Sequence, residues 1–311
     1  PFLRYGYLQQ WWQTLGGGEW DSGRLCICAG YKDEKLAGIA PLFHTVKEGL
    51  PLLHFIGSRE ISDYLDIIAA PEDYQDFLTA LLEFLVKDVP AVWEKAVFEN
   101  IPEHSPFLSL IQKCIPPNTD ILLEKTYSAP LLTLPSTWEE YLAALDKKQR
   151  HEIRRKIRRV EQEAADQRFY FVEEDLDITH YANIFLDLMK EDEQKKAFLT
   201  PSMQDTILSI LEWGHNEGML RLCFLDINGV PAAGYFCFGD GNTIYIYNSG
   251  FSNEMQYFSP GWVLLSYLIE WAIENSHEAI DFMRGSESYK YKFGAVDTLL
   301  YRGILDRKFA S

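Results

Sequence analysis

The amino-acid sequence predicts an α+β protein made of two related halves. Its 311 residues exceed what one compact hydrophobic core usually organises, which favours two domains. The composition, 47% hydrophobic and 14% aromatic, is typical of a globular chain. The predicted helices and strands also follow one order twice. We therefore expect an N-terminal half at 1–128 and a C-terminal half at 129–311.

The first half shows the order β-β-β-α-β after an opening helix. Alternating apolar residues predict a hairpin, and a helical repeat of apolar residues begins after Pro71. The predicted segments are a helix at 2–15, strands at 24–29, 36–43 and 52–56, a helix from 71, and a strand at 96–98.

The second half repeats this order after a long helical region at 136–165 and a helix-rich insertion that ends near Gly218. Asn228-Gly229 marks a hairpin turn, because both residues tolerate positive φ. The predicted segments are strands at 220–226, 230–238 and 243–250, a helix at 260–275, a strand at 279–283, a short helix at 288–293 and a last strand at 299–305.

Two local echoes support a tandem duplication. The run Lys35-Leu36-Ala37-Gly38-Ile39 resembles Pro231-Ala232-Ala233-Gly234-Tyr235, and the helix openings Pro71 and Pro260 lie roughly 190 residues apart. A duplicated α+β unit explains this repetition better than two unrelated domains.

A formal charge of -17 argues against a DNA-binding protein, because clustered Lys and Arg drive association with phosphate backbones. The predicted basic helix at 146–165 is the exception, with eight basic residues between Lys147 and Arg159. Arg150, Arg154 and Arg158 form a positive stripe opposite an apolar one. This stripe is either a solvated face or a site that binds an anionic substrate.

Cysteine and histidine residues give no sign of a metal site. The five cysteines are odd in number and scattered, which favours buried thiols over disulfides or zinc ligands. Apolar runs fall well short of the roughly 20 residues that span a bilayer. Since no signal peptide opens the chain, we expect a cytoplasmic protein without a membrane span or metal.

The segment 245–262 places a strand and a loop before a helix that begins at Ser259-Pro260-Gly261. Ser259 is expected to cap this helix, and Pro260 suits its first position. A helix start has free backbone N–H groups and a partial positive charge, which suits a phosphate. The alternative is that the triplet only starts a helix.

The segment 280–294 places polar residues where a strand leaves the sheet, a common position for an active site. These residues include Asp281, Arg284, Glu287 and Tyr289. The alternative is an ion pair between Arg284 and Glu287, with Tyr289 in an apolar cleft.

These two segments together resemble the C-terminal signature of the CelD-like branch of the GNAT superfamily, named from cellulose biosynthesis clusters. In the first half, 36–42 and 62–66 are similar to the same branch, so the resemblance covers nearly the whole chain. The signature comprises Gly250, Ser259-Pro260-Gly261, Asp281-Phe282, Arg284-Gly285, Glu287, Tyr289-Lys290 and Gly294.

The resemblance implies tandem GNAT-like halves, each a mixed β-sheet with flanking helices, and transfer of an acyl group from acetyl-CoA or another acyl-CoA. It places the donor pyrophosphate at the helix that starts at Ser259, and gives Tyr289 the proton transfer to the leaving thiolate, with Tyr291 in reserve. Under this interpretation Asp281, Arg284 and Glu287 complete the catalytic group. The donor-binding residues are Gln256, Ser259, Gly261, Trp262 and Asn248, and the acceptor-binding residues are Arg150, Arg154, Arg158, Tyr247 and Lys290.

The acceptor implied is a small molecule, or a glycan or lipid-linked precursor of the cell envelope or an exopolysaccharide. The sequence departs from the superfamily pattern, because the usual glycine-rich phosphate loop is absent and Pro260 lacks an N–H group. The paired halves and the basic helix also resemble the Fem aminoacyltransferases, whose donor is a charged tRNA. A non-catalytic binding protein on the same fold is the third hypothesis. The first half, with Glu72 at the equivalent helix start, is expected to be degenerate.

Overall fold

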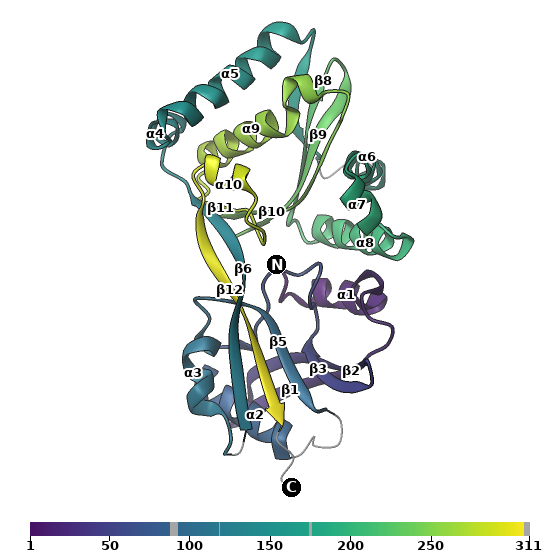
Figure 1. The fold of residues 1–311 in the computed structure, drawn as a ribbon, viewed down its shortest axis with the longest axis vertical. Coiled ribbons are helices and arrows are strands. Elements are labelled where there is room, and N and C mark those ends of the chain that lie inside the picture. The colour runs from purple at the N-terminus through teal and green to yellow at the C-terminus, as the bar shows by residue number, and fades with distance from the viewer. Residues whose placement is uncertain (88–92, 118, 174–175, 308–311) are drawn as a thin grey trace. The chain divides into compact units, whose positions relative to one another are not determined.

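A computed structural model describes residues 1–87, 93–117, 119–173 and 176–307. The chain divides into two compact units (Figure 1). Unit 1 comprises Pro1–Ser128 and the residues from Thr298 onward, and unit 2 comprises Ala129–Asp297. Each unit is an α+β structure with helices on both faces of a mixed sheet, as the sequence predicts.

Unit 1 has the strand order β1-β2-β3-β5-β12-β6. Helix α1 lies on one face, where Trp11 packs on Phe43 with ring centroids 5.3 Å apart. Helix α2 lies on the opposite face, where the Phe77 ring covers Gly38. The bounds are α1 Tyr5–Gly18, β1 Arg24–Lys32, β2 Lys35–Lys47, β3 Leu50–Phe55, β4 Ile68–Ala69, α2 Tyr74–Lys87, β5 Lys95–Pro102, α3 Pro106–Cys114, β6 Thr119–Thr133 and β12 Val296–Arg307.

Unit 2 has the strand order β6-β11-β10-β9-β8-β7. Helices α6 and α8 pack on one face of its sheet and α9 on the other, with α5 against α9 (Figure 1). The bounds are α4 Trp138–Ala144, α5 Lys147–Glu163, β7 Gln167–Phe171, α6 Ile178–Lys190, α7 Glu193–Phe198, α8 Pro201–Asn216, β8 Leu220–Ile227, β9 Val230–Asp240, β10 Thr243–Phe251, the 3-10 turn η1 Gln256–Phe258, α9 Pro260–Glu274, β11 Ala279–Asp281 and α10 Ser288–Lys292.

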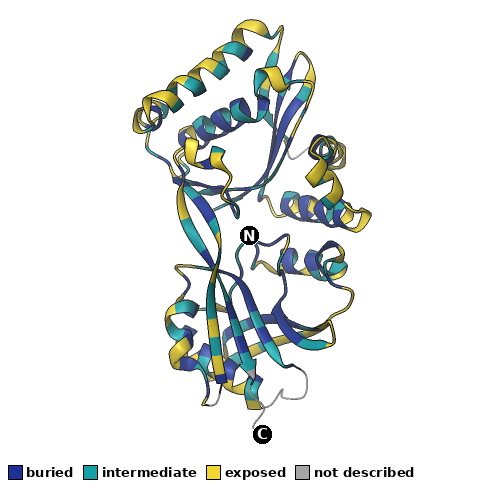
Figure 2. Cartoon of the chain, in the orientation of Figure 1, coloured by how far each residue is buried: buried dark blue, intermediate teal, exposed yellow. Residues whose placement is uncertain are grey.

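Burial follows this layering. Buried residues lie along the strands and on the sheet-facing sides of the helices (Figure 2). The core beneath α9 includes Ile153 and Val160 of α5, so the apolar stripe predicted on the basic helix does face the core.

The pairing pattern of the two sheets is the same. In unit 1, β1, β2 and β3 pair antiparallel, and β3 then pairs parallel with β5. In unit 2, β8, β9 and β10 pair antiparallel, and β10 pairs parallel with β11. Both first hairpins carry a bulge next to the turn, with Ala37 and Ala232 as the extra residues. These shared irregularities support a duplication.

The last strands of the two repeats are exchanged. Strand β6, which ends the first repeat, pairs with β11 of unit 2, while β12, which ends the second repeat, pairs with β5 of unit 1. The expected second half at 129–311 is therefore corrected: from Thr298 onward the chain contributes to the sheet of unit 1.

Two further predictions need correction. The helical region at 136–165 is two helices, because Leu145 is extended and Asp146 caps α5 by accepting a hydrogen bond from the Gln149 amide. The hairpin registers also align Lys35 with Val230, so the two runs compared in the sequence are offset by one residue.

Candidate functional site: a pocket at the start of α9

The site in unit 2 begins where two parallel strands separate. Strands β10 and β11 pair over only three residues each, Thr243–Tyr245 and Ala279–Asp281. Strand β10 continues to Phe251 along β9 alone, with a register shift between Ile246 and Asn248. The edge of β10 beyond Tyr245 is thus left without β11, and the gap opens toward the start of α9.

Helix α9 begins with a left-handed residue. Ser259 has φ 54 and ψ 53, and its side chain makes no capping hydrogen bond, so the expected cap is corrected. Its carbonyl accepts from the amides of Trp262 and Val263 instead. Pro260 has no N–H, and the Gly261 amide belongs to the first turn, where no carbonyl of the same helix reaches it. This helix start therefore offers few backbone donors.

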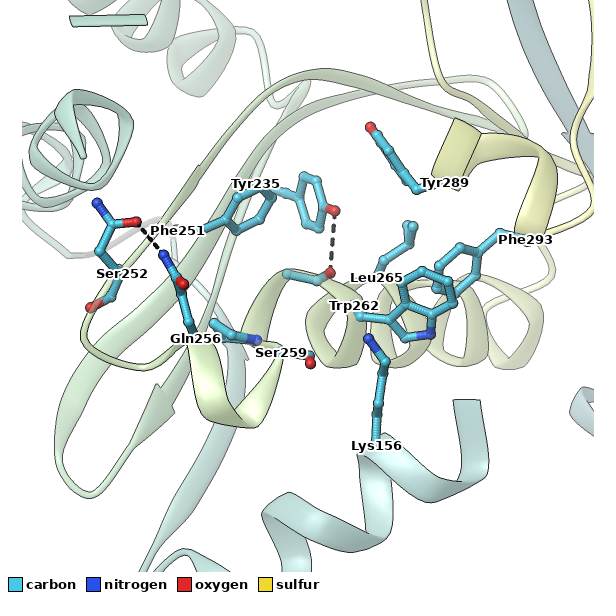
Figure 3. A pocket seen from close by; sticks show the side chains of 13 residues that line it. Lys156, Tyr235, Phe251, Ser252, Gln256, Ser259, Trp262, Leu265, Tyr289 and Phe293 are labelled. Atoms are coloured by element: carbon cyan, nitrogen blue, oxygen red, sulfur yellow. Dashed lines mark hydrogen bonds between the residues drawn. The ribbon is translucent and has the colours of Figure 1, made fainter. Parts of the chain in front are cut away.

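A pocket of about 360 Å³ lies against this helix start (Figure 3). Four of the five predicted donor-binding residues line it: Gln256, Ser259, Gly261 and Trp262. Asn248 does not, and its side-chain oxygen accepts from the Ser249 amide. The remaining lining residues are Lys156, Tyr235, Phe251, Ser252, Asn253, Pro260, Leu265, Tyr289 and Phe293.

One end of the pocket is basic and aromatic. The Lys156 ammonium lies 4.3 Å from the centre of the Trp262 ring, and that of Lys292 lies 5.7 Å from it. Burial lowers the pKa of Lys156, although Glu152, 3.5 Å away, opposes that shift. On the same face of α5, Arg159 donates a 2.8 Å hydrogen bond to the Tyr257 carbonyl. Positive charge thus supplements the few backbone donors at α9.

The basic residues that the sequence singled out on α5 point elsewhere. Arg150 donates to the carbonyls of Leu142 and Ala143, Arg158 donates to that of Arg154, and Arg154 itself is exposed. None of the three lines the pocket. Lys156 and Arg159 instead occupy the side of α5 next to α9. Acceptor binding by the three arginines stays a prediction.

Two tyrosines lie at the opposite end of the pocket from Lys156 (Figure 3). The Tyr235 hydroxyl donates to the Gly261 carbonyl at 3.3 Å. Burial, followed by the charge of Glu287, raises the pKa of Tyr289 well above its usual range. The Tyr289 hydroxyl therefore keeps its proton at neutral pH.

The loop before Tyr289 is held by a buried lysine. The Lys290 ammonium donates to the carbonyls of Met283, Arg284 and Gly285 and forms a 2.9 Å ion pair with Glu287. With the residue only 3% exposed, these contacts argue against the predicted substrate contact. Lys290 instead fixes the loop that orients Tyr289.

The other predicted residues do not line the pocket. Asp281 is buried and accepts from the Met283 amide at 2.7 Å. Burial acts to raise the pKa of Glu287, but the hydrogen bond and charge of Lys290 outweigh it and the net pKa is lowered. Arg284 is partly buried in the same loop. Tyr247 packs on Phe236 and Phe238, and the Tyr291 hydroxyl donates to Asp297.

Sequence reasoning missed Lys156 and Tyr235. Lys156 lies three residues after the core residue Ile153, so it borders the apolar stripe, and that helical spacing could have identified it. Tyr235 follows Gly234 in a buried strand and looks like a core residue in the sequence, since nothing local shows that its hydroxyl reaches a pocket.

The equivalent strand edge in unit 1 is closed. The Leu65 amide donates to the Asn100 carbonyl at 3.0 Å, and the Asn100 amide group donates to the Ser62 carbonyl at 2.6 Å, so a loop lies along β5. Beside it, the buried Asp66 carboxylate accepts from the hydroxyls of Tyr74 and Ser105. The pocket of unit 2 therefore has no open counterpart along this edge.

Comparison with known proteins identifies the class of the fold. Residues 147–291 match the model of an acetyltransferase (GNAT) domain, which covers α5, Tyr289 and every lining residue of the pocket except Phe293. The chain as a whole has the fold of a tandem GNAT protein. No curated protein sequence matches it significantly.

Three solved structures resemble nearly the whole chain. A FemX structure has a TM-score of 0.68 and 12% identity, over 97% of this chain and 91% of that one. The C-terminal domain of a putative lysylphosphatidylglycerol synthetase from Agrobacterium fabrum has a TM-score of 0.60 and 12% identity, over 96% and 91%. A tandem GNAT protein from the clavulanic acid biosynthesis pathway has a TM-score of 0.52 and 8% identity, over 98% and 96%. At these low sequence identities the comparison shows a shared fold and nothing about substrates.

Two features of the described residues concern membrane and metal binding. None of their helices combines the length and apolar character needed to cross a bilayer. Their His, Cys, Asp and Glu side chains form no group of three or more that could hold a metal ion.

Proposed function

We propose that unit 2 transfers an acyl group from an acyl-CoA to an amine or hydroxyl of a cell-envelope or exopolysaccharide precursor. The observation that carries this proposal is one pocket with basic residues at one end and a protonated tyrosine at the other. The acceptor class rests on the resemblance to the CelD-like branch.

The residues of the pocket suit such a donor. A CoA thioester has phosphates at one end and a narrow, flexible arm that leads to the thioester. Lys156 and Lys292, with the helix dipole of α9, would hold the phosphates. The apolar side chains of Phe251, Leu265 and Phe293 would line the arm. The two lysines supply the attraction that the missing N–H of Pro260 cannot.

The reaction needs one proton donor at the leaving sulfur. The acceptor nucleophile forms a bond to the thioester carbon and releases its proton, the carbon–sulfur bond breaks, and the electron pair leaves on sulfur. Tyr289 would give its proton to this thiolate and recover one from solvent. Lys290 and Glu287 keep the loop in place, while Asp281 and Arg284 support the same segment. We propose that unit 1 does not catalyse transfer, since its equivalent strand edge is occupied.

A second candidate function is transfer from an aminoacyl-tRNA, as in the Fem resemblance. The supporting observation is the outer face of α5, where Lys147, Lys148 and Arg154 are exposed in an otherwise acidic chain. A positive helix face of this kind attracts an RNA backbone. Filter binding of charged tRNA near physiological salt tests it; retention that is insensitive to salt, or absent, argues against this donor.

Replacement of Tyr289 by Phe tests the leading proposal. With acetyl-CoA as donor we expect release of CoA to slow by about 10² to 10⁴-fold, while CoA affinity changes little, because the hydroxyl acts as the thiolate leaves. Tyr291→Phe is the matched control, as its hydroxyl bonds Asp297 outside the pocket. Full activity of Tyr289→Phe, or loss of activity in Tyr291→Phe alone, would contradict the assignment.

A further inference from the structure

The helical insertion of unit 2 delivers a partly buried lysine, Lys195, to the strand gap. Lys195 lies on α7, a short helix whose sequence carries no recognisable motif. Its ammonium nitrogen is 3.0 Å from the Ser249 hydroxyl oxygen and also donates to the Ser249 carbonyl. Ser249 belongs to the part of β10 that β11 no longer accompanies. Lys195 thus reaches the region where the strands separate.

Lys195 also adjoins the wall of the pocket. Its nitrogen lies 5.9 Å from the centre of the Phe251 ring, and Phe251 lines the pocket opposite Tyr289 (Figure 3). Two carboxylates face the lysine, Asp192 at the start of α7 and Glu287 of the loop before Tyr289. The charge of Glu287 acts on both Lys195 and Tyr289, so the two side chains share one electrostatic environment.

The environments of Lys195 and Tyr289 shift their pKa values in opposite directions. Burial lowers the pKa of Lys195 to about 8, although Asp192 and Glu287 oppose the shift. Burial raises the pKa of Tyr289. A pair of titratable groups displaced in opposite directions at one site is the usual sign of an acid and a base. The neutral amine of Lys195 is therefore a minor form at pH 7 and becomes the main form above about pH 8.

We propose that Lys195 removes the proton from the acceptor nucleophile, a proposal that rests on the proposed acyl transfer. The neutral amine of Lys195 takes the proton as the nucleophile bonds to the thioester carbon. Tyr289 protonates the departing sulfur. Lys195 then passes its proton to solvent and Tyr289 regains one, so that the two side chains return to their starting states. The Ser249 hydroxyl and carbonyl aim the lysine.

Release of CoA from acetyl-CoA, measured from pH 6 to pH 10, tests this role, with water or a surrogate amine as nucleophile. The wild-type rate should rise with pH and level off above about 8, because only the neutral amine accepts a proton. Lys195→Met should lower the plateau by about 10² to 10⁴-fold and abolish the rising limb. Lys196→Met, an exposed neighbour paired with Glu193, is the control and should match wild type.

Lys195→Arg separates a base from a structural cation. Arginine keeps the charge and can donate to Ser249, but it does not release its proton in this range. We expect it to be as inactive as Lys195→Met while CoA binding, measured by calorimetry, is retained. A wild-type pH profile in Lys195→Met, or full activity in Lys195→Arg, would overturn the proposal and leave acyl transfer intact. A wild type that neither binds CoA nor releases it from acetyl-CoA would overturn the proposed function itself.

Discussion

Replacement of Lys290 by Met distinguishes a lysine that holds a loop from one that binds substrate. The side chain is buried and its ammonium donates to three backbone carbonyls and pairs with Glu287. A methionine of similar length fills the volume but leaves the carbonyls of Met283, Arg284 and Gly285 without this donor. The change therefore isolates the hydrogen bonds.

The size of the effect follows from these contacts. A hydrogen bond to a charged group contributes about 1.5 to 3 kcal/mol, and three that share one donor are not additive. The Glu287 side chain is 58% exposed, so its ion pair adds little. We therefore expect Lys290→Met to lower the free energy of unfolding by about 3 kcal/mol. For a unit of this size that lowers Tm by about 6 to 12 °C.

Thermal unfolding followed by circular dichroism measures the change, with Lys196→Met as the exposed control, expected within about 0.5 kcal/mol of wild type. The rate of acyl transfer should also fall, because Lys290 no longer holds the loop that orients Tyr289. An unchanged Tm together with a raised KM would refute this reasoning and restore Lys290 as a substrate-binding residue.

Three other substitutions test separate features, two in unit 2 and one in unit 1. Gly250→Ala should destabilise unit 2 by about 3 kcal/mol in urea unfolding, because its Cβ would lie 2.6 Å from the Met189 amide nitrogen; a variant of wild-type stability would contradict the packing of α6 on β10. Gly261→Ala should weaken CoA binding by about tenfold in calorimetry, since its Cβ would lie 2.4 Å from the Phe251 ring and push it into the pocket. His54 is buried, neither ring nitrogen has a partner in the described residues, and burial lowers its pKa to about 3. The pKa of His54 in the folded state lies below the unfolded value of about 6.5. The free energy of unfolding therefore falls as the pH falls, by about 2 kcal/mol at pH 5. His54→Leu should therefore be less sensitive to acid than wild type, and an equal loss between pH 7 and pH 5 would contradict this.

The duplicated fold was predictable because its signals are local. Hairpin turns, the helix start at Pro260 and strand alternation each depend on neighbouring residues, and they predicted the repeated β-β-β-α-β order. The prediction missed α3, β6 and β7. The exchange of β6 and β12 could not be predicted from the sequence, because the pairing partners of a strand depend on long-range geometry that no local pattern records. For the same reason the last strand was assigned to the wrong unit.

The candidate site was predictable only in part. The α9 start and Tyr289 lie in contiguous motifs, and both line the pocket. On α5 the sequence did not identify Lys156, because counting charges at helical spacing selected Arg150, Arg154 and Arg158, while Lys156 on the border of the apolar stripe reaches Trp262. Lys195 could not be found, as its chemistry depends on burial against Ser249, which is distant in sequence.

Calorimetric titration of the protein with CoA tests most directly whether this pocket holds the donor. The account predicts binding that weakens with salt and that loses about tenfold in affinity in Lys156→Met, because a phosphate loses its charged partner. Arg155→Met, which removes an exposed charge from the adjacent position of α5, should change the affinity by no more than about twofold. Absence of CoA binding in the wild type, or affinity that is unchanged by Lys156→Met, would contradict a donor site at the start of α9.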